Sequence, residues 1–200
     1  MIKAATSLHA QALPACRWDA FHLARAVRVL RRGGVVLHAT EGVWGLACDA
    51  SDTTAVSRIL TIKRRAATKG LILIGGLAAA FADELAGLDP TQRELIEASW
   101  PGPVTWILPT GRFSPLVTGG TGSVAVRVPG HEQARCLAMA FGRPLVSTSA
   151  NVAGRPAATR SWQAVRAVGT LVDYVLPGAT GGRRGASEIR RPGGVVVRQR

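Results

Sequence analysis

The chain has 200 residues and a mass of 20.9 kDa, enough for one domain that buries roughly 70% of the surface exposed by the unfolded chain. Its longest uncharged runs, such as LILIGGLAAAFA, are shorter than the roughly 18 apolar residues of a membrane span, and residues 1–18 lack the apolar run of a signal peptide. With 25 basic against 12 acidic residues, the net charge of +13 favours anionic partners, an arginine-rich genome being the alternative explanation.

Three cysteines, Cys16, Cys48 and Cys136, are far apart in the sequence. Their number is odd, there is no CxxC pair, and no histidine lies at metal-ligand spacing from them. This usage is typical of a reducing compartment, so we expect a cytoplasmic protein whose cysteines are small core residues.

The first predicted helix runs from Asp19 to Arg32, with Asp19 as N-cap and a Gly-Gly pair as the stop signal. The sequence therefore predicts a leader at 1–18, which need not be ordered, and one domain at 19–200. A short apolar strand at 35–40 follows the helix and ends at Thr40. A second helix is predicted at 53–65, with Asp52 as its N-cap.

The remainder of the chain alternates short apolar strands with helical patterns. Strands are predicted at 70–76, 104–109, 123–129, 144–148, 171–177 and 194–199, and helices at 77–86, 90–99, 131–141 and 160–168. This alternation predicts an α/β fold with one twisted sheet flanked by helices. The sheet should be mixed, because some connections are too short for parallel crossovers.

Basic residues gather in KRRAATKG, where Lys63 and Arg65 end a helix and Lys69 follows it. Cations complement a helix C-terminus, which accounts for the first two as well as a ligand would. Lys69 lies beyond the helix, where a clamp for phosphates would need it. No Walker A sequence is present, so any phosphate site is of another type.

Two further stretches have a structural and a functional interpretation. GTGSVA resembles a dinucleotide fingerprint, but residues from Ser123 onward alternate like a strand, which is the wrong context. Arg127 on that strand is either solvated or an inward-pointing cation beside a ligand. STSAN, residues 147–151, either forms a turn through local hydrogen bonds to the backbone or lines a binding site. There is no GxSxG motif of a nucleophile elbow. The basic residues and the small polar residues at strand ends therefore favour binding of an anionic nucleotide over nucleophilic catalysis.

Five blocks taken together resemble the YrdC family, in its short bacterial form: HATEGVWGLACDA, IKRRAATKGLILIGG, WPGPVTWILP, SVAVRVPGH and PLVSTSANVAGRP. The resemblance covers about residues 19 to 200. It implies a single-domain YrdC-like α/β fold, a twisted mixed sheet flanked by helices with a concave basic cleft. It also implies a nucleotidyltransferase reaction that makes L-threonylcarbamoyladenylate and pyrophosphate from L-threonine, bicarbonate and ATP. Mg²⁺ is expected on the ATP phosphates.

The resemblance carries the family's site residues onto matching positions of this chain. It implies catalytic roles for Lys63, Arg65, Ser149 and Asn151. It implies ATP binding by those four together with Ser123 and Arg198, and threonine binding by Thr40, Lys69, Arg127, Ser147 and Ser187. The product would serve threonylcarbamoyladenosine modification of tRNA beside the anticodon, with tRNA and a threonylcarbamoyl transferase complex as partners and no membrane.

His38-Ala39 departs from the family's usual Tyr-Pro before Thr40. His38 either takes over a polar contact or only packs. The alternative function is a YrdC-like paralogue that binds double-stranded RNA or tRNA without strong synthase activity. Retention of the Lys63, Arg65, Ser149 and Asn151 set favours the synthase, because an RNA-binding surface does not need polar groups at the end of a buried strand.

Overall fold

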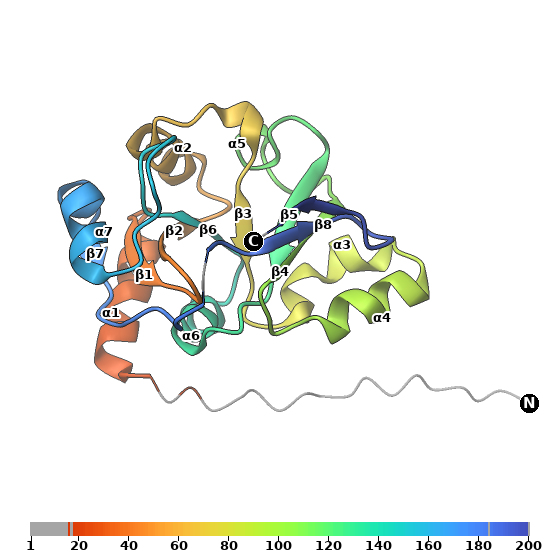
Figure 1. Cartoon of the computed structure of the whole chain (residues 1–200), viewed down its shortest axis with the longest axis horizontal. Helices are drawn as coiled ribbons and strands as arrows, with labels where there is room; N and C mark the ends of the chain where they lie inside the picture. Colours follow the sequence, from red (N-terminus) through yellow and green to blue (C-terminus); the bar gives the residue numbers. More distant parts are fainter. Residues whose placement is uncertain (1–15, 17, 184, 200) are drawn as a thin grey trace, which may run out of the picture.

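A computed structural model describes residues 16, 18–183 and 185–199 as one mixed sheet with helices on both faces (Figure 1). The strand order is β7-β1-β2-β6-β3-β5-β4-β8-β9. β1 pairs with β7, β3 with β5, and β4 with β8 in parallel, whereas the other neighbouring strands are antiparallel. The predicted mixed α/β fold is confirmed.

The strands are short, and the helices lie between them along the chain. The strands are β1 (Val36–Ala39), β2 (Trp44–Asp49), β3 (Ile72–Ile74), β4 (Val104–Pro109), β5 (Ser123–Arg127), β6 (Leu145–Ser149), β7 (Tyr174–Val175), β8 (Glu188–Arg190) and β9 (Val196–Arg198). The α-helices are α1 (Ala20–Arg31), α2 (Thr53–Lys63), α3 (Ala82–Ala86), α4 (Pro90–Ala98), α5 (Pro115–Thr118), α6 (Glu132–Phe141) and α7 (Ser161–Val168). The 3₁₀ helices of the described residues are η1 (Ala67–Lys69), η2 (Ala78–Phe81) and η3 (Gly169–Leu171).

Helix ends follow the capping residues of the sequence. The Asp19 carboxylate accepts hydrogen bonds from the backbone N–H groups of the first turn of α1, and Asp52 does the same for α2. α2 ends at Lys63 because Arg64 adopts the left-handed conformation, with φ of 47°. The predicted helix to residue 65 is therefore two residues too long, and Arg65 lies in the following turn.

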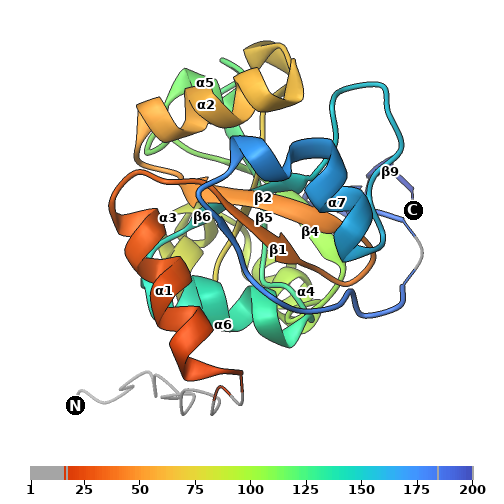
Figure 2. The same ribbon diagram turned by 90° about the vertical axis from the view of Figure 1, so that its left-hand side faces the viewer.

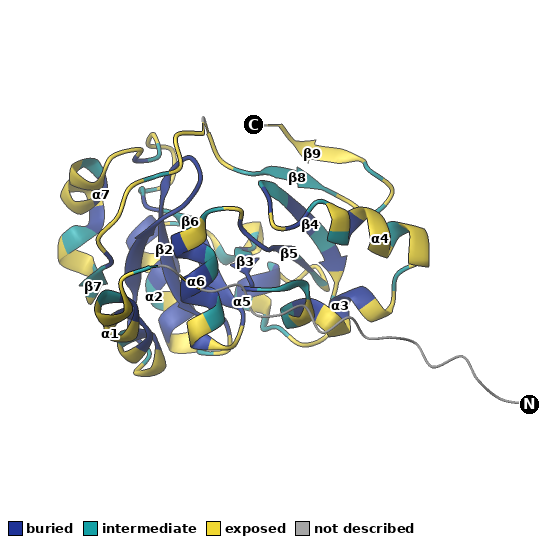
Figure 3. Cartoon of the chain, turned by 90° about the horizontal axis from the view of Figure 1, so that it is seen from below, coloured by how far each residue is buried: buried dark blue, intermediate teal, exposed yellow. Residues whose placement is uncertain are grey.

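Alternate strand residues face two apolar clusters, one on each side of the sheet. Leu37 and Val146 pack into the larger cluster with α2 and α7 residues, whereas Val36 and Leu145 pack with α1 and α6. Figure 2 shows α2 above the sheet and α1 with α6 below it. In Figure 3 the central strands are buried, while β9 is exposed at one edge. No helix among the described residues has the length and apolarity needed to span a membrane.

The predicted role as small core residues holds for Cys48 and Cys136, which are buried, but not for Cys16, which is exposed. The reduced state expected from the cysteine usage is wrong for two of the three. Cys16 and Cys136 form a disulfide, with Cα atoms 5.8 Å apart. The pairing arises because α1 packs against α6, which brings the segment before α1 beside Cys136. Cys48 is free and buried as predicted, and burial raises the pKa of its thiol. Of the predicted leader 1–18, residues 1–15 and 17 lie outside the described part of the chain.

Candidate functional site

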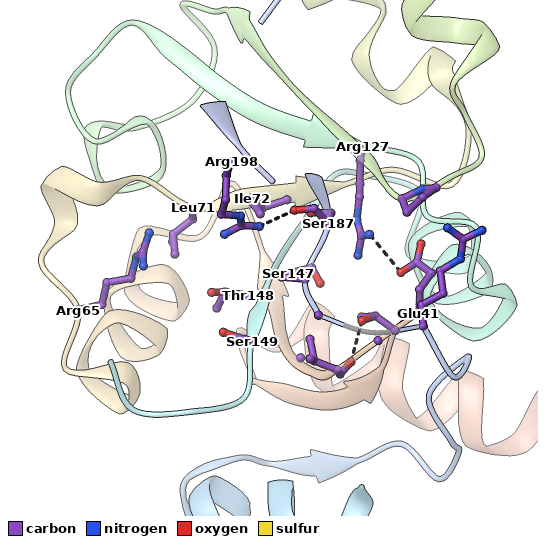
Figure 4. Close-up of a pocket in the computed structure, with 18 residues that line it drawn as sticks. Glu41, Arg65, Leu71, Ile72, Arg127, Ser147, Thr148, Ser149, Ser187 and Arg198 are labelled. Atoms are coloured by element: carbon purple, nitrogen blue, oxygen red, sulfur yellow. Dashed lines mark hydrogen bonds and ion pairs between the residues drawn. The ribbon is translucent and has the colours of Figure 1, made fainter. Parts of the chain in front are cut away.

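Two adjoining cavities lie where β1, β5, β6 and the C-terminal strands meet. We call the first the inner pocket (Figure 4). Its lining residues are Thr40, Glu41, Gly42, Val43, Gly45, Arg65, Leu71, Ile72, Pro103, Arg127, Ser147, Thr148, Ser149, Arg183, Gly185, Ala186, Ser187 and Arg198. In the close-up, Arg65 and Arg127 lie at opposite ends, with Ser147 to Ser149 between them. Its volume is about 110 Å³, which suits a group the size of an amino acid.

The outer pocket is larger, about 410 Å³. It shares Arg65, Leu71, Ile72 and Arg198 with the inner pocket, so these residues form the boundary between the two. Its other lining residues are Thr68, Lys69, Gly70, Ile107, Val117, Thr118, Thr121, Ser123, Ala125, Ile189, Arg191 and Val197. Three arginines and one lysine around a partly apolar floor suit an anionic ligand with an apolar portion.

A buried ion pair closes one end of the inner pocket. Arg127 ends β5, and its Nη1 lies 3.1 Å from Glu41 Oε2. Glu41 Oε1 accepts the backbone N–H of Gly130 at 2.8 Å, which fixes the carboxylate. Burial lowers the pKa of Arg127, and the nearby Glu41 opposes that shift. Glu41 engages Nη1, whereas the buried Nε–H of Arg127 has no hydrogen-bond partner among the described residues.

Thr40 and Ser147 bring two hydroxyl groups to the same pocket. Thr40 follows β1 directly, and its hydroxyl donates to the carbonyl of Val43 at 2.7 Å. Ser147 is central in β6, and its Oγ lies 3.3 Å from Nε2 of His38. Both side chains are buried, so a ligand that contacts them is shielded from water.

Lys63 joins the end of α2 to the loop after β6. Its Nζ donates to the carbonyl of Ser149, to Ser149 Oγ at 3.3 Å, and to the carbonyl and Oδ1 of Asn151 at 3.1 and 3.4 Å. Burial lowers the pKa of Lys63 to about 8, with a smaller contribution from the charge of Arg65. Among the described residues, neither Lys63 nor Asn151 lines these two pockets; both contact Ser149, which does.

Arg65 is presented to both pockets by the turn after α2. Its guanidinium donates to the carbonyls of Lys69 and Gly70, at 3.1 and 3.0 Å from Nη2. These bonds hold the arginine against the end of η1, and Arg65 lines both cavities. Lys69 lines the outer pocket, apart from the other predicted threonine-binding residues, which line the inner one.

The C-terminal strands close the site from the other side. Ser187 Oγ lies 2.8 Å from Thr105 Oγ1, and the Ser187 carbonyl accepts from Arg198 Nη2 at 2.8 Å. Burial lowers the pKa of Arg198, and repulsion from the charges of Arg127 and Arg65 lowers it further. Such repulsion among cations favours an anion between them. Ser123, predicted near ATP, lines the outer pocket.

The segment before β8 crosses close over Gly42. A Cβ at this position would lie 2.2 Å from the Gly185 carbonyl oxygen and 2.8 Å from that of Arg183. We expect Gly42→Ala to displace this segment and reduce turnover about tenfold or more, with a small change in melting temperature, because both contacts lie outside the core. Steady-state rates and thermal melts measure the two effects. Gly111→Ala is the control, since nothing lies within 4 Å of its Cβ position. Equal losses in both variants would contradict the expectation.

The structure groups most of the predicted site residues. Thr40, Arg65, Arg127, Ser147, Ser149, Ser187 and Arg198 line the inner pocket. Thr148, between Ser147 and Ser149 on β6, is among the lining residues too. Sequence reasoning missed Glu41 as the partner of Arg127, although its position directly after Thr40 was a usable signal. The described residues contain no group of three or more His, Cys, Asp or Glu side chains able to hold a metal ion.

Fold and pockets together define an α/β protein with a small polar pocket beside a larger basic one. The family model of Sua5, YciO and YrdC proteins, described as "Telomere recombination", matches residues 28–199. The chain belongs to this family, as its blocks of sequence predicted.

Two curated relatives are bacterial proteins named threonylcarbamoyl-AMP synthase. The relative from Nitrosococcus oceani is 47% identical over 166 residues, covering 82% of this chain and 90% of its own length. The relative from Hahella chejuensis is 45% identical over 183 residues, covering 90% of this chain and all of its own. These relatives are enzymes, and they match nearly the whole described fold.

Solved structures show the same fold. Sua5 from P. abyssi, crystallised in complex with L-threonine, matches with a TM-score of 0.81 and 30% identity over 88% of this chain. The match covers 52% of the Sua5 chain, so the present chain spans about half of that protein. YciO from E. coli matches with a TM-score of 0.76 at 24% identity, covering 88% of each chain, and shows the fold alone.

Proposed function

We propose that the chain is a threonylcarbamoyl-AMP synthase that converts L-threonine, bicarbonate and ATP into L-threonylcarbamoyladenylate and pyrophosphate. The observation that carries the proposal is the pairing of two pockets across one arginine-lined boundary, an amino-acid-sized chamber ending in Arg127 and a larger basic chamber. The names of the curated relatives and the threonine complex of Sua5 support the same activity.

Threonine fits the inner pocket by charge and by hydrogen bonding. Its carboxylate would pair with Arg127, and its amine would face the hydroxyls of Thr40 and Ser147. Its side-chain hydroxyl would then face Ser187, which closes the pocket from the C-terminal side. ATP would lie in the outer pocket near Ser123 and Lys69, with its α-phosphate at the boundary formed by Arg65 and Arg198.

The reaction needs positioning and charge neutralisation more than an enzyme nucleophile. Bicarbonate takes up a proton and loses water to give carbon dioxide. The threonine amine attacks its carbon and loses a proton, forming a carbamate. A carbamate oxygen attacks the α-phosphorus, the bond to the bridging oxygen breaks, and pyrophosphate leaves. This is an adenylyl transfer, in which Arg65 and Arg198 would stabilise the growing negative charge.

Lys63, Ser149 and Asn151 would act as a unit that shapes the wall between the substrates. Of this unit Ser149 is the member that reaches the pocket, so it would contact the reacting groups directly. The carboxylate at the pocket, Glu41, is already paired with Arg127. The protein therefore offers Mg²⁺ no cluster of ligands among its described residues, and any Mg²⁺ would arrive on the ATP phosphates.

Omission of single substrates tests the proposal. Pyrophosphate release should require ATP, threonine and bicarbonate together, because attack on the α-phosphorus needs the carbamate. Release from ATP alone would contradict a synthase. The RNA-binding alternative makes a different prediction, namely tight tRNA binding by a protein that releases no pyrophosphate under any combination of substrates.

The lowered pKa of Lys63, about 8, predicts a pH dependence of ATP binding. Loss of the ammonium charge above that pKa removes an attraction for the phosphates. Because Lys63 lines neither pocket and acts from a distance, ATP affinity measured without threonine should fall about threefold as the pH rises through 8 and then level off. Calorimetric titrations across this range measure it. Lys63→Arg, which keeps its charge, should remove the fall, and a wild-type affinity that stays constant would contradict the expectation.

We propose, in addition, that residues 19–200 make up the functional domain, since the family model matches 28–199 of it. Product hand-over to a threonylcarbamoyl transferase complex for tRNA modification is part of the same proposal. It would follow from the anhydride between carbamate and phosphate, which hydrolyses unless it is consumed. A loss of modification from cells that retain the synthase but lack such a complex would support that step.

A further inference from the structure

His38 contacts a substrate-pocket residue across an intervening strand. His38 lies on β1 and Ser147 on β6, with β2 between them. Gly45 of β2 is the register partner of His38, and a Cβ there would lie 3.2 Å from His38 Nε2 and 3.5 Å from Ser147 Oγ. Because Gly45 has no side chain, the imidazole reaches over β2 and its Nε2 lies 3.3 Å from Ser147 Oγ.

The hydrogen-bond partners of the imidazole determine its tautomer. Nδ1 lies 3.1 Å from the carbonyl oxygen of Ala39, which can only accept, so Nδ1 carries the proton. Nε2 of the neutral ring then has a lone pair and can only accept. Burial lowers the pKa of His38 to about 3, and His131 and Arg127 nearby add to that shift, so the ring stays neutral.

A serine hydroxyl has one proton and two lone pairs. Because Nε2 of His38 can only accept, the Ser147 hydroxyl donates its hydrogen bond to the ring. The Ser147 oxygen therefore presents only its lone pairs to the inner pocket. The Thr40 hydroxyl likewise presents only lone pairs, since it donates its hydrogen bond to the carbonyl of Val43. The pocket therefore presents two hydroxyl oxygens that accept, beside the guanidinium of Arg127 that donates.

We infer that His38 is a positioning residue that orients the Ser147 hydroxyl as an acceptor and so makes the inner pocket selective for a ligand with an amino group beside its carboxylate. This inference rests on the proposed function and identifies the residue that sets its specificity. His38 does not touch the substrate. A ligand that places an accepting oxygen, such as that of a second carboxylate, where the amino group would lie faces the lone pairs of Ser147 and Thr40. Such a ligand binds weakly, because neither side has a hydrogen to donate.

Three variants at position 38 separate hydrogen bonding from packing. His38→Asn keeps an N–H for the Ala39 carbonyl and loses the acceptor at the Nε2 position. His38→Gln places an amide oxygen near that position and can accept the Ser147 proton. His38→Phe keeps an aromatic ring, slightly larger than imidazole, and removes both polar groups. Thermal melts of each variant report whether the fold is retained.

Calorimetry of L-threonine binding is the test, because it requires no turnover. We expect His38→Asn to weaken threonine binding about tenfold, the effect of losing one hydrogen bond to a charged group, and His38→Gln to restore most of it. Binding of 3-hydroxybutyrate, which is threonine without its amine, should stay unchanged in both variants. Equal losses for both ligands would overturn the inference in favour of a packing role.

A double variant tests whether His38 acts through Ser147. If it does, His38→Asn combined with Ser147→Ala should bind threonine as Ser147→Ala alone does. Additive losses would overturn the inference. A wild-type protein that binds threonine but makes no adenylate would instead contradict the proposed function, so the two failures are distinguishable.

Discussion

Arg127→Ala is expected to lose threonine binding and a large part of the stability of the protein. The guanidinium is the proposed partner of the substrate carboxylate, and its loss should raise the KM for threonine on the order of 100-fold. The same change leaves the carboxylate of Glu41 buried without its ion-pair partner, which costs about 3–5 kcal/mol of unfolding free energy. Urea denaturation and threonine-dependent rates measure the two effects.

The control for Arg127→Ala is a double variant that removes both charges. Arg127→Met with Glu41→Gln leaves neutral groups of similar size in place of the ion pair. Most of the lost stability should return, because no charge remains buried alone, whereas threonine binding should stay lost. Recovery of activity together with stability would contradict the role of Arg127 as a ligand-binding residue.

Arg65→Ala is expected to affect ATP far more than the fold. Arg65 lines both pockets, at the boundary where the α-phosphate is proposed to lie. We expect kcat/KM for ATP to fall on the order of 100-fold, because the arginine stabilises charge that grows in the transition state. Its bonds to the carbonyls of Lys69 and Gly70 lie in a surface turn, so unfolding free energy should fall by only about 1 kcal/mol.

Arg64 offers a matched control for Arg65. It is exposed, carries the same charge, and adopts the left-handed backbone conformation that glycine tolerates. Arg64→Gly should therefore leave ATP turnover within about twofold of wild type. If both variants reduce turnover equally, the effect belongs to the overall positive field and not to the position of Arg65.

Local signals in the sequence predicted much of the fold. The strand at 104–109 has the predicted bounds, and Asp19 and Asp52 cap their helices because the capping bond depends only on nearby residues. β8 was missed, since GASEIR has no apolar alternation and forms a strand only by pairing with β4.

Contacts between distant residues limited the prediction of the site. The sequence indicated Lys63, Ser149 and Asn151, but their mutual hydrogen bonds depend on how α2 and β6 meet. Glu41 and Arg127 are 86 positions apart, and the Cys16–Cys136 pair is separated by 120, so neither pairing follows from local pattern. The resemblance supplied roles, whereas the geometry divides them: Lys69 belongs to the outer pocket and Arg127 to the inner one.

The adenylate itself is the most direct measure of the proposed function. The protein is incubated with ATP, L-threonine and ¹³C-labelled bicarbonate, and the nucleotide products are separated and weighed by mass spectrometry. A synthase yields threonylcarbamoyl-AMP that carries one labelled carbon, and this product disappears with Arg127→Ala and with Arg65→Ala. AMP without label, or a labelled adenylate formed equally well by both variants, would contradict the assignment of the two pockets.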